Sequence, residues 1–300
     1  MMNALKLTLL LSLLAGPIAG WSQDKGEPLT VKSTALTGNL YLLQGRGGNV
    51  VASVGADGIL LVDDDYGEYA EAYHEVLKGI SGNDGKASYV INTHWHGDHV
   101  GSNGYWGERG AVIMAQRNVY ARMSTRQEMK VFNRVVEASP KEALPVVTYG
   151  NAMALHFNDD DIEIEHAPSS HTDGDSVVYF SAYNVVHMGD LYFKDRYPFV
   201  DIGSGGNVLS FTENVARVLA RVDEKTIIVP GHGTLANRED LARYHEMLVS
   251  TTATVKAGLE AGKSVAAIAE DGLGDAWVAW DAGFIKTEAW VGFIAASLAE

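Results

Sequence analysis

The stretch Thr93-His94-Trp95-His96-Gly97-Asp98-His99 places three imidazoles and a carboxylate within six consecutive residues, directly after the apolar run at residues 87–91. Such a run is typical of a β-strand. Alternate residues of an extended chain point to the same side, so His94 and His96 can grip one cation. Gly97 allows a sharp turn that directs Asp98 and His99 toward another cation. The stretch therefore predicts a site for two metal ions at the end of a strand.

Three later segments offer further ligands: Ser170-His171-Thr172-Asp173-Gly174-Asp175, Met188-Gly189-Asp190 and Pro230-Gly231-His232-Gly233. If these segments lie beside the first motif in the fold, they complete two sets of ligands. One ion is then held by His94, His96 and His171, and the other by Asp98, His99 and His232. Asp190 is left as a carboxylate that can bridge both ions. Each ion then keeps an open position where water can bind and lose a proton near neutral pH. The predicted reaction is hydrolysis by hydroxide, with Asp98 as a catalytic residue that steadies or shuttles a proton.

Two more ordinary interpretations stand beside the metal site. A lone histidine next to apolar residues is more often packed or exposed than a ligand, and this applies to His74, His156, His166, His187 and His245. Three imidazoles within six residues would instead repel one another's protons unless a cation organised them. Gly-Asp at a strand end is also a common turn, so the ligand role of Asp190 depends on its place between the two later histidines.

In order and approximate spacing, these residues resemble the metallo-β-lactamase superfamily, with its pattern His-x-His-x-Asp-His, then His, Asp and His. The resemblance implies a hydrolase that uses two Zn²⁺ ions, with iron or manganese as alternatives. Zinc β-lactamases of the first subclass typically have cysteine at the position of Asp190, and this chain contains no cysteine. The resemblance is thus to an exported β-lactamase-like branch whose ligand set is closer to that of glyoxalase II and the lactonases.

The order of strand-like and helix-like segments predicts an α/β (α+β) protein. The chain is 46% hydrophobic and has no Pro/Ser linker or charge block, so residues 23–300 are expected to form a single domain. Strand-like runs at 40–43, 49–54 and 58–62 precede a helical stripe at 66–80. A second series of strands lies near 152–157, 162–166, 176–180 and 185–187, followed by a helical stripe at 211–222. We expect two similar halves stacked as a four-layer αββα sandwich, the fold that the resemblance also implies, with the metals at the seam.

Helical stripes near the carboxyl end, at residues 241–248 and 290–298, are expected to pack in the core. The polar segment 124–145, interrupted by Pro140 and Pro145, is expected to border the substrate cleft.

Orienting partners and substrate contacts are harder to place. A ligating imidazole normally donates its other N–H to a carboxylate or carbonyl. Asp63 and Asp64 follow the apolar run 59–62 and are the leading partners, unless they form a solvated turn. Thr93, Thr172 and Asp173 are further candidates. Trp95, Lys194 and Asn207 are expected to contact substrate. Lys194 resembles the lysine with which β-lactamases bind the drug carboxylate, and Asn207 resembles the asparagine on their oxyanion side. The alternatives are that Lys194 is an exposed lysine and that Asn207 lies in a surface turn. Further candidate substrate contacts are the glycine-rich loop 45–49, Tyr105, Tyr197 and the turn at residues 203–207.

The formal net charge of −15 argues against a nucleic-acid partner, because an acidic surface repels phosphates. Residues 1–22 carry Lys6, an apolar core at 7–15 and small residues at 16–20, a pattern typical of a cleaved secretory signal. The apolar core is shorter than the about 20 residues that a membrane span needs. We therefore expect a periplasmic or secreted protein with no stable membrane insertion, an uncleaved anchor being the alternative.

Export favours a small-molecule substrate such as a cyclic amide or ester, including β-lactams, over the glutathione thioesters of the cytosol. A lactonase or thioesterase is the alternative hydrolase. Two functions other than hydrolysis remain compatible with the sequence: an iron-dependent oxidoreductase and a noncatalytic metal-binding protein. It does not indicate the oligomeric state.

Overall fold

A computed structural model of the chain describes residues 29–299. The expected signal at residues 1–22 lies outside the described residues. Within residues 29–299, no helix is long and apolar enough to cross a membrane.

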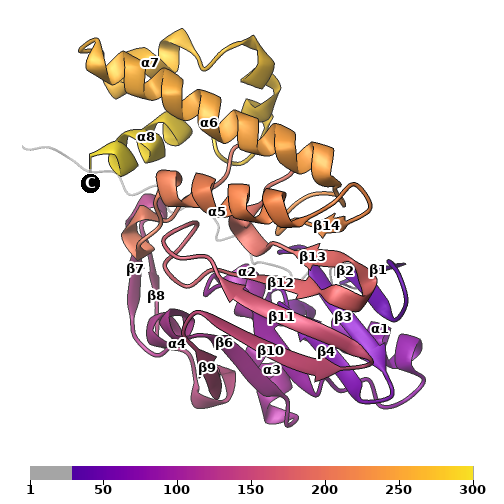
Figure 1. Ribbon diagram of the computed structural model, residues 1–300. Coiled ribbons are helices and arrows are strands. Elements are labelled where there is room, and N and C mark those ends of the chain that lie inside the picture. Colours follow the sequence, from indigo (N-terminus) through magenta and orange to yellow (C-terminus); the bar gives the residue numbers. More distant parts are fainter. Residues whose placement is uncertain (1–28, 300) are drawn as a thin grey trace, which may run out of the picture.

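Two β-sheets lie face to face between outer layers of helices (Figure 1). The first sheet has the strand order β1-β2-β3-β4-β5-β6-β9. Its strands up to β4 pair antiparallel, and those from β4 to β9 pair parallel. The strands are β1 (Lys32–Ala35), β2 (Leu40–Gln44), β3 (Val50–Gly55), β4 (Gly58–Val62), β5 (Tyr89–Asn92), β6 (Val112–Gln116) and β9 (Val147–Tyr149).

The second sheet has the order β10-β11-β12-β13-β14, antiparallel except for the parallel pair β13–β14. Its strands are β10 (Ala152–Phe157), β11 (Asp160–His166), β12 (Ser176–Phe180), β13 (Val185–His187) and β14 (Ile227–Val229). A separate hairpin of β7 (Gln127–Met129) and β8 (Arg134–Val136) lies in the polar segment 124–145.

The helices form the outer layers and the connections. α1 (Ala70–Ser81) and α3 (Asn103–Glu108) pack on the first sheet, whereas α5 (Val208–Arg221) covers the second. α6 (Arg238–Glu260) and α8 (Thr287–Leu298) pack on α5. α7 (Val265–Asp271) packs on α6 and α8, and the short helices α2 (Gly97–Val100) and α4 (Arg117–Met123) follow β5 and β6. The expected helix at 66–80 begins with a 3-10 turn, Gly67–Tyr69, and becomes α-helical from Ala70.

Strand β4 shows how the sequence produces the layers. Its Leu60 and Val62 face the second sheet, where they meet Ile162 and Val178. Its Ile59 and Leu61 face α1 on the opposite side. Because side chains alternate along a strand, an apolar residue at every position requires a partner layer on both faces. The αββα sandwich predicted from the sequence is confirmed.

Candidate metal centre

The predicted ligands lie at strand ends along one edge of the two sheets. The motif 93–99 follows β5, whose buried residues hold its base. His171 lies in the loop between β11 and β12, Asp190 lies in a 3-10 turn (Gly189–Leu191) after β13, and His232 follows β14. Strands of both sheets therefore deliver residues from distant parts of the chain to the same place.

One group of ligand atoms belongs to His94, His96, His171 and Asp190, all of them buried and within 4.8 Å of one another. His171 Nε2 lies 2.8 Å from His96 Nδ1 and 3.4 Å from Asp190 Oδ2. His94 Nε2 lies 3.8 Å from the same Asp190 oxygen. Three imidazole nitrogens and a carboxylate oxygen at this spacing can surround a single cation.

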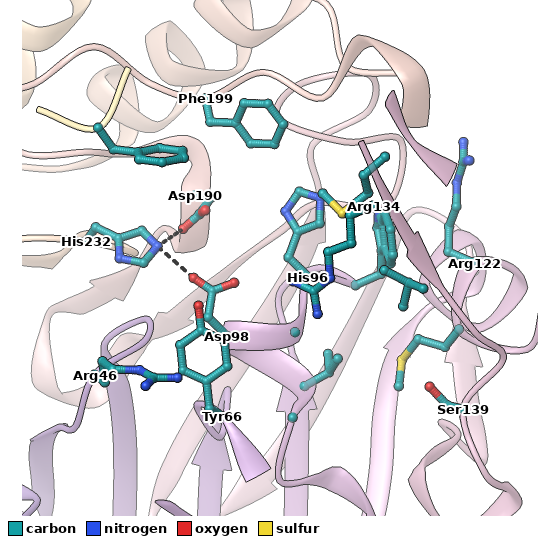
Figure 2. A pocket seen from close by; sticks show the side chains of 18 of the residues that line it. Arg46, Tyr66, His96, Asp98, Arg122, Arg134, Ser139, Asp190, Phe199 and His232 are labelled. Carbon is teal, nitrogen blue, oxygen red and sulfur yellow. Dashed lines mark ion pairs between the residues drawn. The ribbon is translucent and has the colours of Figure 1, made fainter. Parts of the chain in front are cut away.

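A second group belongs to Asp98, His99 and His232. Asp98 Oδ2 lies 3.3 Å from His232 Nε2 and 3.7 Å from His99 Nε2. The other oxygen of Asp190, Oδ1, lies 3.2 Å from His99 Nε2 and 3.4 Å from His232 Nε2. Figure 2 shows Asp98, Asp190 and His232 facing one another. Asp190 thus presents one oxygen to each group, which is the arrangement of a bridging ligand.

Buried polar atoms without a hydrogen-bond partner indicate that the two ligand groups suit cations. His94 Nε2 and Asp190 Oδ1 are buried and have no hydrogen-bond partner among the described residues. A buried polar atom without a partner costs free energy, roughly 1–3 kcal/mol by mutational measurements. Both atoms face the ligand groups, so cations held there would satisfy them. The nitrogen and oxygen donors suit zinc, and also iron or manganese.

The charges of the imidazoles differ between the two groups. Burial lowers the pKa of His94, and it lowers that of His171 to about 4, so both rings are neutral and keep a lone pair for a metal. Burial also acts to lower the pKa of His99 and His232, but the Asp190 carboxylate and its acidic neighbours outweigh it. The pKa of His99 is well above its usual value, and that of His232 is about 9. The carboxylates of the second group therefore favour positive charge beside them.

Of the two expected orienting carboxylates, Asp63 contacts a ligand and Asp64 does not. His99 Nδ1 donates to Asp63 Oδ2 at 2.7 Å, which leaves His99 Nε2 directed at the second group. Asp63 also accepts from the Thr93 amide at 2.7 Å and the Thr93 hydroxyl at 2.8 Å. Asp64 Oδ1 instead accepts from the Ser102 amide at 3.0 Å, and burial raises the pKa of its carboxyl. Asp63 thus joins the strand end to a ligand ring.

Two further orienting groups were not foreseen from the sequence. Asp201 Oδ2 lies 3.1 Å from His96 Nε2, and the Phe199 carbonyl accepts from His171 Nδ1 at 2.7 Å. Thr93 Oγ1 lies 3.1 Å from His94 Nδ1, as expected of an orienting partner. Thr172 instead bonds to Asp175, and the Asp173 carboxylate pairs with Arg122. No local motif marks Asp201, because its contact spans 105 residues of chain.

We expect Asp63→Asn to weaken divalent-metal affinity by roughly 10–100-fold, the usual effect of losing a carboxylate that orients a ligating histidine. The amide is uncharged and supports the His99 ring less strongly. Asp64→Asn is the matched control, because it makes the same change at a buried neighbour that contacts no imidazole. Competition with a chromogenic chelator gives the affinities. Equal affinity in wild type and Asp63→Asn would contradict the orienting role.

A cavity of about 550 Å³ opens onto the ligand groups (Figure 2). Its wall includes His96, Asp98, Asp190 and His232, and segment 124–145 contributes to the wall as expected. Of the expected substrate contacts, Trp95 and Tyr197 line this cavity, and so does Arg46 of the glycine-rich loop.

Lys194, Asn207 and Tyr105 do not reach this cavity. Lys194 Nζ donates to the Leu235 carbonyl at 2.9 Å and pairs with Asp240 at 2.8 Å, which draws it to the start of α6. The side chain of Asn207 accepts from the amides of Leu209 and Ser210 and so caps α5. Tyr105 hydrogen-bonds to His74 on the helical face of the first sheet. The substrate role expected of these side chains has no geometric support.

Comparisons with known proteins agree with this geometry. A family model described as the metallo-beta-lactamase superfamily matches residues 34–232. An uncharacterized protein of Aquifex aeolicus is 27% identical over 184 residues, which cover 61% of this chain and 82% of that protein. The metallo-beta-lactamase type 2 of Bacteroides fragilis is 22% identical over 156 residues, 51% of this chain and 56% of that one.

Solved structures share the fold at low identity. The DIM-1 metallo-beta-lactamase has a TM-score of 0.59 and 15% identity, covering 73% of this chain and 97% of that one. A metallo-beta-lactamase from Pontibacter korlensis has a TM-score of 0.58 and 17% identity, with coverage of 73% and 99%. A double mutant of the sec-alkyl sulfatase PisA1 has a TM-score of 0.67 and 13% identity, covering 88% of this chain but only 49% of its own.

Proposed function

The chain belongs to the metallo-β-lactamase superfamily, and from this membership and the geometry of the metal centre we propose that it is a dinuclear zinc hydrolase. The position of Asp190 carries the proposal. One of its oxygens faces His94 and His171, and the other faces His99 and His232. A carboxylate placed in this way would hold two cations close enough to act on one substrate group.

When bound, two zinc ions would supply water activated near neutral pH and Lewis acidity toward a carbonyl oxygen. The protein's residues hold and orient this chemistry. Asp63 and Asp201 fix the rings of His99 and His96 through the nitrogens turned away from the ligand groups. The side chain of Asp98 is 22% exposed and lines the cavity, so its carboxylate can accept or pass on a proton at the substrate.

We propose a small cyclic amide or ester as the substrate, with β-lactams included. The cavity volume of about 550 Å³ is that of a small-molecule site. The export expected from the sequence favours this class over glutathione thioesters. A lactonase or thioesterase is the second candidate, favoured by the oxygen and nitrogen ligand set with aspartate at position 190.

Metal analysis of the purified protein tests the metal centre, with two zinc ions per chain expected. Hydrolysis of a carbapenem, a cephalosporin, a homoserine lactone and an acyl thioester then tests the reaction. Turnover of at least one substrate is expected, with loss on chelation and recovery on zinc addition. Hydrolysis of the lactone alone would contradict the β-lactam assignment. Metal binding without turnover across the panel would favour a noncatalytic protein, and an iron-loaded active preparation would contradict zinc.

A further inference from the structure

The cavity beside the metal centre is rich in arginine although the chain has a formal net charge of −15. Arg46, Arg122, Arg134 and Arg196 all line it. Two of them are already paired with carboxylates: Arg46 with Glu68 at 2.7 Å and Arg122 with Asp173 at 2.7 Å. These two guanidinium groups are neutralised by the protein itself.

Arg134 on β8 differs from the paired arginines. Among the described residues, nothing forms a hydrogen bond or ion pair with its guanidinium, and Figure 2 shows it among the residues that line the cavity. Apart from the carboxylates of the metal centre, the acidic residue in this wall is Glu137. It pairs with Arg126 at 3.6 Å and not with Arg134. Arg196 donates from Nε to the Lys194 carbonyl at 3.3 Å. Arg134 is therefore the cavity cation with the most unused hydrogen-bonding capacity.

The hairpin that carries Arg134 is fixed to the scaffold at its base. Gln127 Nε2 donates to the Arg122 carbonyl at 3.1 Å, and Arg122 Nη1 donates back to Gln127 Oε1 at 3.2 Å. The amide of Ser139 donates to the Met123 carbonyl at 2.8 Å. Met129 and Val136 pack against the apolar cluster that contains Trp95. The base holds β8 in place beside the metal motif.

The tip of the same hairpin reaches the opposite half of the molecule. The ring of Phe132 lies 5.0 Å from Phe199 and 5.7 Å from Phe284, measured between centroids. Phe199 in turn lies 5.8 Å from the ring of His96. With both ends in contact, the hairpin forms a wall of the cavity, and Arg134 is part of that wall.

The remaining cavity surface is largely apolar. It includes Val100, Met123, Met129, Val136, Phe199 and Ile285. Such a surface binds an aromatic or branched aliphatic group by the hydrophobic effect. The cavity therefore combines a metal centre, an apolar wall and an arginine without a partner among the described residues.

We propose that the substrate is an amphipathic carboxylate: its apolar body lies against this wall, and its carboxylate pairs with Arg134. The planar guanidinium can donate two parallel N–H bonds to a carboxylate, which gives both charge and orientation. This inference rests on the proposed function, because that function places the bond to be cleaved at the metal centre. The contact with the anion depends only on Arg134 and the cavity.

Calorimetric titration of the zinc-loaded protein with 4-phenylbutyrate and with its uncharged amide tests this contact. We expect the wild type to bind the carboxylate roughly tenfold more tightly than the amide, the scale of a hydrogen bond to a charged group. Arg134→Ala should lose about tenfold in carboxylate affinity and leave amide affinity unchanged. Arg134→Lys should recover part of the loss. Arg109→Ala is the control, because Arg109 is an exposed arginine outside the cavity that donates to the Tyr105 carbonyl at 3.0 Å.

Equal affinity of wild type for carboxylate and amide would overturn the proposal, as would no detectable carboxylate binding. An equal loss for both ligands in Arg134→Ala, or the same loss in Arg109→Ala, would show that the effect is not specific to a contact with Arg134 and would also overturn it. Turnover is not needed for this measurement. A protein that hydrolyses nothing yet binds the carboxylate through Arg134 would contradict the proposed function and leave the carboxylate contact with Arg134 standing.

Discussion

Asp190→Ala is expected to lower kcat/KM by roughly 10³-fold or more and to reduce the bound zinc in the same preparation. The substitution removes the oxygen that faces His94 and His171 together with the oxygen that faces His99 and His232. The remaining imidazoles would then surround cations with less negative charge and no shared ligand. Loss of metal and loss of turnover should therefore appear together.

Mass spectrometry of the metal content and steady-state kinetics on the same sample check this result. His96→Ala removes a ligand from the first group alone and should also lower both metal and turnover. Asp195→Asn is a control, because Asp195 is an exposed carboxylate close in sequence whose ion partner is Arg243, and asparagine tolerates its left-handed backbone. Unchanged turnover in Asp190→Ala or in His96→Ala would contradict the metal assignment. Circular dichroism of each variant separates loss of metal from loss of fold.

The first motif was predicted to bring His94 and His96 to one cation through strand alternation. The structure places both in one ligand group, but β5 ends at Asn92 and the two histidines lie in the short connection that follows it. As expected, Gly97 marks a change of direction, because it starts α2, which carries Asp98 and His99. The structure brings all seven predicted residues into the two neighbouring groups. The layers were predictable because strands with apolar residues on both faces require cover on both faces.

Contacts between distant segments were not predictable in this way. Asp201 and the Phe199 carbonyl reach the ligand rings from a loop whose path depends on tertiary packing. Lys194 lies close to Asp190 in sequence, but Asp195 has a left-handed backbone with φ of 57° and the lysine side chain turns to Asp240 at α6. Sequence spacing alone does not determine the direction of a side chain in such a loop.

The helix-capping role of Asn207 was readable from the sequence, but the residue was interpreted as a substrate contact. Asparagine just before an amphipathic stripe is a common helix N-cap, and the stripe here begins at Val208. Segment 124–145 was expected to border the cleft, but nothing in its sequence indicated the hairpin of β7 and β8. Its strands have three residues each, and they are fixed by contacts with α4 and with Phe199 and Phe284.

The carboxyl-terminal helices were expected only to pack, and Trp290 shows how that packing supports the cavity. Trp290 lies in α8 with an exposed fraction of 0%. Its indole N–H donates to the Thr251 hydroxyl in α6 at 3.0 Å. Its ring stacks on Tyr197, with centroids 6.0 Å apart and planes at 15°. Since Tyr197 lines the cavity, α8 and α6 are joined to its wall through this one side chain.

Trp290→Ala is therefore expected to lower the free energy of unfolding by about 3–5 kcal/mol, because truncation leaves a cavity among α6, α8 and Tyr197. A protein of this size should then lose roughly 10 °C in melting temperature. Trp290→Phe keeps an aromatic ring and gives up the bond to Thr251, so its loss should be clearly smaller. Denaturation at one fixed zinc concentration keeps metal linkage equal among the variants. A change within about 1 kcal/mol for Trp290→Ala would contradict a core role, because fully buried tryptophans cost more than this when truncated.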